Sequence, residues 1–422
     1  KTSTDVQGAT QTGTPEFELE GTNSNGEKVK VTPDLDYPAK LVDPATGQVT
    51  DEATVTVAGE GTYTIDQATG KVTFKPEPGF TGTANGVTVS VTAPVGRDKD
   101  GQVPADALKT ATAKYTPTVT PITLTPTNKV SEDVQNVPQT QTPTFELSND
   151  KTAKITSKKL VDPATGQPTD ATTVTVAGEG SYTIDPTTGA VTFVPEENFI
   201  GTAKGITVQA TATIKNEDGK TTTITADATY TPTVVPAVPT AQPAKSIDVQ
   251  GATQKGKPTF EGTTVTVNGQ QKPVTIKENS YKLLDKDGNE VTSTPAYAED
   301  GTTVIGTHTI DPTTGEVTFT PTDKSYSGKV TPVSVQAESS NGIKVSTTYT
   351  PEIVPVTPTA QDAATKDIQG KTQKGKPTFE GGKATVDGVE KTVEIDEDTP
   401  ATFEDGSTTK TIPGEGTYTV AP

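Results

Sequence analysis

The chain contains no cysteine, so no disulfide can stabilise it. Methionine and tryptophan are also absent, and His308 is the single histidine. A fold without disulfides depends on packing, on hydrogen bonds or on some other cross-link. Nucleophilic catalysis that relies on a cysteine, or on several histidines, is excluded by composition alone.

Basic side chains are also scarce. Arg97 is the only arginine, and 35 lysine and arginine residues stand against 54 aspartate and glutamate residues, a net charge of −19. Such a surface repels phosphate backbones and anionic lipids, so we predict no nucleic-acid partner. No apolar run approaches the ~20 residues of a membrane-spanning helix, so we predict no membrane insertion. Because the acidic surface repels itself, we expect a soluble, monomeric fragment.

Apolar residues make up only 29% of the chain. Leu, Ile, Val and Phe together make up roughly a fifth, close to the level at which disorder is expected. Their placement argues for folded structure, because they alternate with threonine in short runs bounded by Gly, Pro, Asn and Asp. This pattern predicts small all-β modules, and no helix is needed anywhere.

One segment recurs three times, as GEGTYTIDQATGKVTFKP at 59–76, GEGSYTIDPTTGAVTFVP at 178–195 and VIGTHTIDPTTGEVTFTP at 304–321. Each copy predicts a β-hairpin with one apolar face and one threonine face. In the second copy Asp185 opens the turn and Gly189 closes it in a left-handed conformation. Asp43, Asp162, Asp66 and Asp311 are likewise explained as turn residues.

Further landmarks recur around each hairpin: a VQGATQ-like start, a PTFE segment, KLVDPATG and a closing YTPTV strand. The spacing is that of whole domains, so each repeat should have its own core. We predict repeats at 1–122, 123–240 and 241–358, and an incomplete fourth repeat at 359–422. The joints, 116–134, 231–249 and 350–368, are rich in Pro, Thr, Val and Ala, which favours stiff, extended linkers.

Many short strands separated by turns predict tandem β-sandwich (Ig-like) domains, joined by Pro/Thr-rich linkers into an elongated rod. Aligned apolar positions nominate the core of each sandwich: Phe17, Phe145, Phe260 and Phe379; Leu41, Leu160, Leu283 and Phe403; Tyr63 and Tyr182; Ile65, Ile184 and Ile310; Phe74, Phe193 and Phe319; Phe80, Phe199 and Tyr326.

Taken together, LVDPATG, GEGSYTIDPTTGAVTF, the F-x-G-T-A element and YTPTV resemble the fibril repeats of streptococcal CshA-type cell-surface adhesins. The resemblance covers nearly the whole chain. It implies a stalk within a wall-anchored fibril, located outside the cell on the bacterial surface, with host glycoprotein bound by other regions of the full-length protein. The third repeat departs from the pattern at 295–309. No LPxTG-type anchor is present, so we expect an internal piece of a longer, processed protein.

Candidate chemical sites are weak. His308 replaces Tyr63 and Tyr182 at a core-facing strand position, which favours a packed histidine over a general base. The acidic clusters Asp34/Asp36, Asp98/Asp100 and Glu217/Asp218 lack a calcium-loop pattern and do not recur, so we interpret them as solvated charge. We therefore predict no catalytic, cofactor-binding or metal-binding residues, no cofactor, and no enzyme activity.

Three aligned lysines, Lys40, Lys159 and Lys282, raise the alternative of an intramolecular amide cross-link. The fourth repeat has Thr402 at this position, and strand alternation turns the position away from the core, so a surface lysine is favoured.

Two functions remain open from the sequence. The first is a structural stalk whose partners are the neighbouring repeats of the same chain. The second is an adhesive module that engages host glycoprotein or neighbouring fibrils through loop tips or exposed strand edges.

Overall fold

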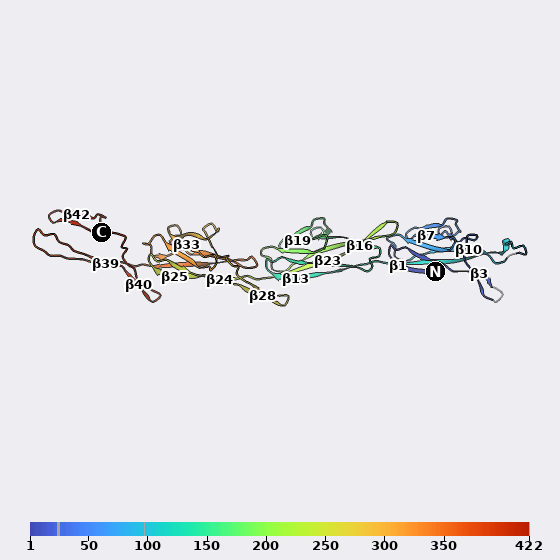
Figure 1. Cartoon of the computed structure of the whole chain (residues 1–422), viewed down its shortest axis with the longest axis horizontal. Helices are drawn as coiled ribbons and strands as arrows, with labels where there is room; N and C mark the ends of the chain where they lie inside the picture. The colour runs from blue at the N-terminus through green and yellow to red at the C-terminus, as the bar shows by residue number, and fades with distance from the viewer. Residues whose placement is uncertain (23–25, 97, 422) are drawn as a thin grey trace. The chain divides into compact units, whose positions relative to one another are not determined.

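A computed structural model describes residues 1–22, 26–96 and 98–421, so Arg97 lies outside the described residues (Figure 1). The chain divides into two compact units, residues 1–235 and 236–422, and each is described here by itself. Both units are all-β, and one 3₁₀ turn, η1 (Ala105–Ala107), interrupts the strands of the first. Among the described residues no helix is long and apolar enough to cross a membrane.

The first repeat is a sandwich of two sheets that lie in separate layers, with β7 in one layer and β10 in the other (Figure 1). One sheet has the order β1-β11-β10-β5 with β9 added against β11, and the other has the order β2-β8-β7-β6. A hairpin of β3 and β4 stands beside them. The strands are β1 (Thr2–Val6), β2 (Gln11–Gly13), β3 (Phe17–Thr22), β4 (Lys28–Val31), β5 (Lys40–Val42), β6 (Thr54–Val57), β7 (Gly61–Asp66), β8 (Lys71–Pro76), β9 (Gly82–Thr83), β10 (Val87–Pro94) and β11 (Leu108–Thr120).

The second repeat repeats this topology, with the sheets β13-β23-β22-β16-β17 and β14-β20-β19-β18. Strand β21 pairs with β23, and a short β12 pairs with β15. The strands are β12 (Leu124–Thr127), β13 (Lys129–Val134), β14 (Gln139–Gln141), β15 (Thr144–Leu147), β16 (Ala153–Asp162), β17 (Gln167–Pro168), β18 (Thr173–Val176), β19 (Gly180–Ile184), β20 (Val191–Pro195), β21 (Gly201–Thr202), β22 (Ile206–Lys215) and β23 (Thr221–Val235).

The third repeat, in the second unit, has the sheets β25-β37-β36-β30-β31 and β26-β34-β33-β32, with β35 against β37 and the pairs β24–β27 and β28–β29. Its hairpin is intact despite the divergent sequence. The strands are β24 (Thr240–Gln242), β25 (Ala244–Val249), β26 (Gln254–Gly256), β27 (Thr259–Glu261), β28 (Thr263–Val267), β29 (Gln270–Val274), β30 (Lys282–Leu284), β31 (Glu290–Val291), β32 (Ser293–Tyr297), β33 (Val304–Ile310), β34 (Val317–Pro321), β35 (Gly328–Lys329), β36 (Val333–Glu338) and β37 (Lys344–Val354).

The first strand of each repeat closes the sandwich. It pairs in parallel with the last strand of the same repeat, as in β1 with β11, and then bends into the other sheet as β2. The bend requires a left-handed residue, which is Gly8 in the first repeat (φ 79°) and Gly251 in the third (φ 78°). Asn136 takes this role in the second repeat (φ 65°), and asparagine is one of the few other residues that tolerate it.

The recurrent hairpin forms as the sequence predicts. Tyr182 on β19 lies opposite Phe193 on β20, and both side chains are fully buried. The Asp185 carbonyl accepts a 2.7 Å hydrogen bond from Gly189 N, and Gly189 is left-handed with φ 81°. The Asp185 carboxylate accepts a bond from the Thr187 amide, which lowers the pKa of Asp185. The predicted turn chemistry is confirmed.

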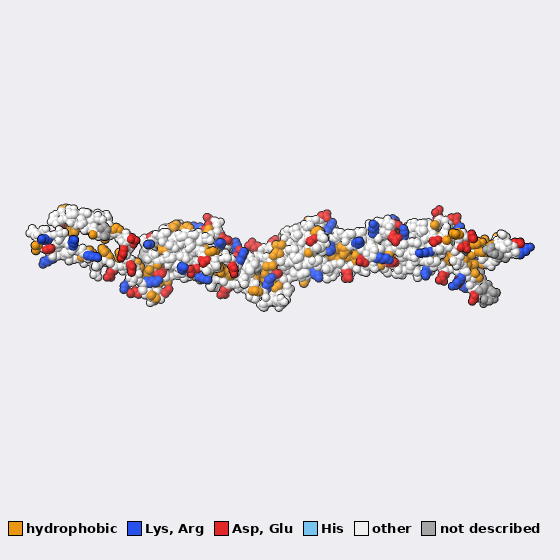
Figure 2. Space-filling model, viewed as in Figure 1, with side chains coloured by type: hydrophobic (Ala, Val, Ile, Leu, Met, Phe, Trp, Pro, Cys, Tyr) orange, Lys and Arg blue, Asp and Glu red, His pale blue; other side chains and the backbone are white. Residues whose placement is uncertain are grey.

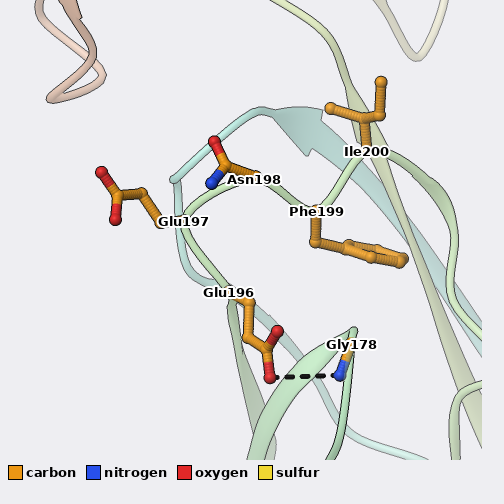
Figure 3. Close-up of a pocket in the computed structure, with 6 residues that line it drawn as sticks. All are labelled: Gly178, Glu196, Glu197, Asn198, Phe199 and Ile200. Atoms are coloured by element: carbon orange, nitrogen blue, oxygen red, sulfur yellow. Dashed lines mark hydrogen bonds between the residues drawn. The ribbon is translucent and has the colours of Figure 1, made fainter.

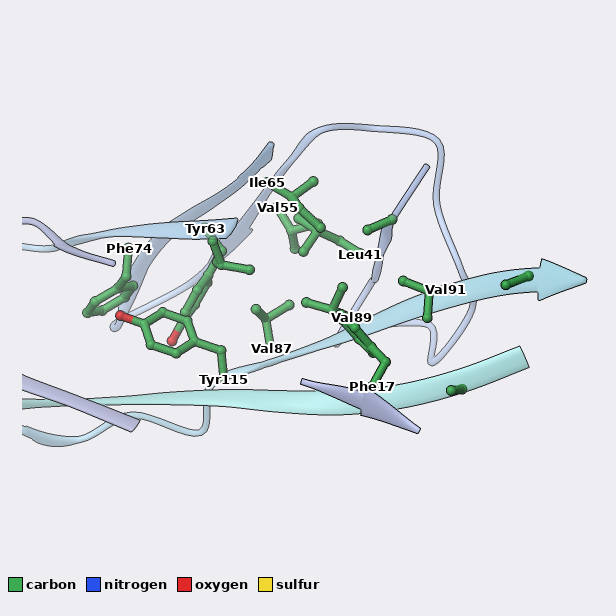
Figure 4. Packing of buried hydrophobic residues seen from close by; sticks show 14 of the residues in the cluster. Phe17, Leu41, Val55, Tyr63, Ile65, Phe74, Val87, Val89, Val91 and Tyr115 are labelled. Atoms are coloured by element: carbon green, nitrogen blue, oxygen red, sulfur yellow. The ribbon is translucent and has the colours of Figure 1, made fainter. Parts of the chain in front are cut away.

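Aromatic rings fill the centre of each sandwich. In the first repeat Tyr63 lies 4.6 Å from Phe74 and 6.5 Å from Tyr115, centroid to centroid. Figure 4 shows Tyr63 and Tyr115 directed toward the space between the layers, with the apolar residues Leu41, Val55, Ile65, Val87, Val89 and Val91 beside them. The same ring arrangement recurs in the second repeat, so a thin interior still buries large side chains.

Most core nominations are confirmed. Buried residues include Phe17, Leu41, Leu160, Leu283, Tyr63, Tyr182, Ile65, Ile184, Ile310, Phe74, Phe193 and Phe319. Partly buried residues at the core edge are Phe80, Phe199, Phe145, Phe260 and Tyr326. The two nominations in the fourth repeat are wrong as core positions, because Phe379 is 56% exposed and Phe403 is only partly buried.

His308 lies in the core of the third repeat, as its strand position predicts. It is 1% exposed, between Phe319 at 5.4 Å and Tyr349 at 5.9 Å. Tyr182, at the same position of the second repeat, donates to the Glu179 carboxylate, whereas the third repeat has Ile305 in place of that glutamate. Burial alone lowers the pKa of His308 to about 4, so the ring is neutral at pH 7.

Residues 359–421 form three separate hairpins in place of a sandwich: β38 (Thr359–Gln361) with β39 (Thr378–Glu380), β40 (Lys383–Val386) with β41 (Val389–Thr392), and β42 (Thr409–Ile412) with β43 (Gly416–Thr419). Tyr418 is 49% exposed, although its counterpart Tyr182 is fully buried. Isolated two-stranded hairpins are marginally stable in water, so this segment is the weakest part of the described chain.

Hydrogen exchange should expose this difference. A buried apolar side chain contributes about 1.5–3 kcal/mol, and residues 379–420 bury few of them. We expect their amides to exchange far faster than those of residues 182–193. Equal protection in dilute monomer would contradict the assignment of separate hairpins.

Acid should destabilise the third repeat selectively. Histidine in an unfolded chain has a pKa near 6.5, and that of folded His308 is about 4, so the unfolded state binds the proton first. Stability is therefore constant above pH ~6.5 and falls between pH ~6.5 and ~4, by up to about 3 kcal/mol. Urea unfolding followed by the amide signals of Val317 and Phe319 measures this loss.

The control for this prediction is His308→Phe, which keeps an aromatic ring and removes the titration. The third repeat of that variant should lose the extra pH dependence between 6.5 and 4. A wild-type profile that matches the variant would show that His308 is not the titrating group.

Candidate functional site

The acidic clusters singled out in the sequence are turn-capping groups or ion-pair partners. The Asp34 carboxylate accepts from the amides of Asp36 and Tyr37, and Asp98 accepts from Asp100 and Gln102. Among the described residues no group of three or more acidic or histidine side chains is arranged to hold a metal ion. Asp218 differs from our expectation of solvated charge, because it pairs with Lys75.

The aligned lysines form surface ion pairs in the first two repeats. Lys40 Nζ lies 2.6 Å from Asp51 Oδ1, and Lys159 Nζ lies 2.6 Å from Asp170 Oδ1. The two carboxylates are 89% and 92% exposed, and the adjacent lysine lowers the pKa of each. These lysines are surface residues, and their carboxylate partners are not buried as a catalysed amide cross-link requires.

A shallow depression lies beside β20 in the second repeat (Figure 3). It is lined by Gly178, Glu196, Glu197, Asn198, Phe199 and Ile200. The Gly178 amide donates to Glu196 at 3.2 Å, and Phe199 packs edge-on against Phe193. The remaining polar groups do not converge on one point, and we assign the depression no ligand.

The most elaborate constellation in the first unit is the joint between its two repeats. A small apolar cluster forms there from Ile122, Ala153 and Ile214, which are at most 3% exposed, with Val6 packed against them. Val6 comes from the first strand of repeat one, Ile122 from the segment between repeats, and Ala153 and Ile214 from β16 and β22 of repeat two. The two repeats thus share buried apolar surface.

Hydrogen bonds to backbone carbonyls join the same surfaces. Thr152 Oγ1 donates to Gln7 O at 2.6 Å, and the buried Asn216 Nδ2 donates to Pro76 O at 3.2 Å. Gly8 leaves room for this contact, because a Cβ there would lie 3.3 Å from Ile214 Cγ2. Each such bond contributes about 1 kcal/mol net and fixes the relative position of the two carbonyls.

Ion pairs surround the joint. Lys75 Nζ lies 2.9 Å from Asp218, Lys220 Nζ lies 3.2 Å from Glu77, and Lys151 Nζ lies 2.6 Å from Asp5. All are partly exposed, so each contributes well under ~1 kcal/mol in salt. Figure 2 shows charges of both signs distributed over the face drawn, with apolar atoms in small separate areas.

The second unit uses the same aspartate position with a lysine from a different element. Asp248, the counterpart of Asp5, accepts two 2.7 Å bonds from Lys391 on β41, whereas Lys151 lies between β15 and β16. The pair therefore joins the third repeat to the hairpin of β40 and β41.

A glutamine supports the bend in the first and third repeats. Gln7 Nε2 donates to Pro78 O at 2.7 Å, and its Oε1 accepts from the Ile122 amide at 3.3 Å. Gln250 repeats both contacts, with Ser325 O and with the Val356 amide. Each glutamine thus fastens the start of its repeat to the segment that leaves it.

A second recurrent network anchors the first strand to the last. Ser3 Oγ donates to Gln11 Oε1 at 2.6 Å and lies 2.7 Å from the Tyr115 hydroxyl. The corresponding residues are Ser131, Gln139 and Tyr230 in the second repeat, and Ser246, Gln254 and Tyr349 in the third. The glutamines and tyrosines belong to the VQGATQ-like and YTPTV landmarks of the sequence, whereas the serines precede those landmarks, and the network itself was not predicted. The signal was the glutamine pair of VQGATQ, VQNVPQ and IQGKTQ, which returns in every repeat.

These features define an array of closed β-sandwiches with structured joints and no converged chemical centre in the described residues. A scan against family models matches the surface adhesin CshA repetitive domain four times, at residues 1–119, 121–234, 236–353 and 355–422. The chain therefore belongs to the CshA repetitive-domain family of surface adhesins, and this family implies an extracellular location.

Solved structures of other modular β-proteins are similar at low identity. The I9–I11 tandem of titin is 12% identical with a TM-score of 0.31, covering 84% of this chain and 96% of that one. Mouse cadherin-23 EC22–24 is 12% identical with a TM-score of 0.24 over 84% and 96%. Human CDH23 EC21–23 is 13% identical with a TM-score of 0.22 over 83% and 97%. A search of curated proteins found no match.

A single hydroxyl tests whether the joint is held by its specific contacts. Thr152→Val removes the bond to Gln7 O while keeping the side-chain shape. We expect about 1 kcal/mol of docking free energy to be lost, seen as faster hydrogen exchange at residues 7–9 with no change at 182–193. Thr156→Val is the matched control, because its hydroxyl bonds only to Thr211 and Thr213 within the second repeat. If both variants gave the same exchange pattern, the joint would not depend on this contact.

Proposed function

We propose that this chain is a spacer in a bacterial surface fibril, holding an adhesive region away from the cell. The single observation that carries the proposal is the structured joint. A chain of independently mobile domains needs no buried contact between neighbours, whereas Asn216, Thr152 and the Ile122 cluster connect the two repeats of the first unit. Buried contacts between neighbours restrict their relative motion, which a spacer requires.

The partners in this proposal are the neighbouring repeats of the same chain. Host glycoprotein binding is assigned to other regions of the full-length protein, as is attachment to the cell wall. No catalytic role is proposed, because the polar groups of the repeats are used in turns, joints and the Ser–Gln–Tyr networks.

The surface composition is consistent with a spacer. The net charge of −19 disfavours non-specific aggregation, and the outward faces carry paired threonines such as Thr173 and Thr183, 2.9 Å apart. Neutral hydroxyls that satisfy one another offer little to a passing ligand, and threonine is well suited to the exposed face of a strand.

Small-angle scattering of the whole chain tests the proposal. A compact protein of this length would have a radius of gyration of about 22 Å. Strands of about ten residues make each sandwich ~30 Å long or more. Repeats arranged in series should therefore have a radius of gyration well above ~30 Å. A radius of gyration near the compact value would rule out the spacer role.

A further inference from the structure

The last strand of the smaller sheet has an open edge in the first two repeats. This strand is β6 in the first repeat and β18 in the second, and both have the sequence TVTV. Each pairs on one side only, with β7 or β19. Thr54, Thr56, Thr173 and Thr175 are exposed.

The free side of each strand presents backbone donors and acceptors. Ala53 O accepts from Ile65 N at 2.8 Å, so the backbone groups of Ala53, Val55 and Val57 are directed at β7. Alternation then directs those of Thr54 and Thr56 away from the sheet. The equivalent bond from Ile184 N to Thr172 O gives Thr173 and Thr175 the same outward direction. In the described part of the chain, no hydrogen bond reaches the outward groups of these four threonines.

The third repeat closes the same edge. The bond from Ile310 N to Thr292 O aligns Pro295 with Thr56 and Thr175, at the second outward position. Proline has no N–H to donate. Beyond it, Ala298 forms a bridge with Val330, and the Thr331 amide donates to Tyr297 O at 2.9 Å. The same fold therefore has an open edge in the first two repeats and a blocked edge in the third.

The open edges are also electrically neutral. Residues 53–59 and 171–178 carry no charged side chain, although the chain has 54 acidic residues. Two acidic residues, Asp51 and Glu52, precede this neutral stretch in the first repeat, and Asp51 is paired with Lys40. Charged residues on an edge strand are a common protection against edge-to-edge pairing, and here they are missing.

We propose that these TVTV edges bind the same edge of a second copy of the chain, as antiparallel strands that join two sheets into one. When Val55 lies opposite Val55 of the second copy, Thr54 of each copy lies opposite Thr56 of the other. The outward groups of the two threonines then exchange four backbone hydrogen bonds. The side chains would continue the threonine ladder that already pairs Thr54 with Thr64 at 3.1 Å.

Self-complementarity selects a second copy as the occupant. A two-fold pair requires a strand that matches itself, and Thr-Val-Thr reads the same in both directions. Like charges do not meet, because the stretch is neutral. One such edge is short and gives a weak contact. Two open edges in one chain raise the avidity where copies are concentrated, as on a fibril-bearing surface. This site goes beyond the spacer role and does not depend on it.

The third repeat supplies the variants that test the proposal in the full chain. The double variant Thr56→Pro/Thr175→Pro copies its blocked edge, and Pro295→Thr opens it. In sedimentation equilibrium at high protein concentration, the double-proline variant should dimerise at least about tenfold more weakly than wild type, and Pro295→Thr more tightly. Unchanged hydrogen exchange at 61–76 and 180–195 in the double-proline variant, and at 304–321 in Pro295→Thr, would verify that both variants remain folded. Equal association constants for all three proteins would overturn the proposal.

Cysteine pairing tests the register, since the chain has no cysteine of its own. Thr54→Cys and Thr56→Cys are prepared as separate proteins. In the proposed pair these positions face each other at a Cα separation of ~5.5 Å, within disulfide range. Oxidising the mixture should give a mixed disulfide dimer, while each protein alone should give little. A mixed yield no higher than those of the separate proteins would contradict this register and, with equal sedimentation behaviour, the edge contact itself.

Discussion

The structure of each repeat depends on the parallel pairing of its first strand with its last. Because β1 lies beside β11 and then crosses into the other sheet at Gly8, one short segment holds both layers together. The same bend carries Gln7, which binds the exit of the repeat, and Asp5, which binds the next one. Closure of the sandwich and connection to the neighbour are thus built on adjacent residues.

This arrangement accounts for how a chain with so few apolar residues stays folded. The interior is a thin layer of aromatic rings and branched side chains. Polar networks such as that of Ser3, Gln11 and Tyr115 add hydrogen bonds that fix the first strand to the last. Burial raises the pKa of the Tyr115 hydroxyl, so it stays protonated and bonded. The third repeat shows that one polar pair can be lost, since His308 and Ile305 replace tyrosine and glutamate without changing the topology.

Much of the local structure was predictable from the sequence, because hairpin signals involve neighbouring residues. The turn at Asp185 and Gly189, the buried face of Tyr182 and Phe193, and the packed His308 all follow from alternation and turn chemistry. The parallel pairing of β1 with β11 could not be predicted in this way, since strands separated by a whole domain leave no local pattern in the sequence.

The joint was visible in the sequence only as composition. Its Pro/Thr-rich segment predicts stiffness, but the buried Ile122 and the partners Thr152 and Asn216 come from a three-dimensional surface. Lys151 is one lysine among many in the sequence, and only the structure pairs it with Asp5. In the sequence, Pro295 belongs to a segment that merely departs from the repeat pattern. Only the structure shows that this proline blocks strand pairing at the edge.

The central claim is that the first two repeats are held in one fixed relation by their joint. Spin labels at Thr64→Cys and Thr183→Cys, equivalent exposed strand positions in the two repeats, measure this directly, because the chain has no other cysteine. A joint with buried contacts predicts a single narrow distribution of distances between the labels. A broad distribution, unchanged by Thr152→Val, would contradict the account.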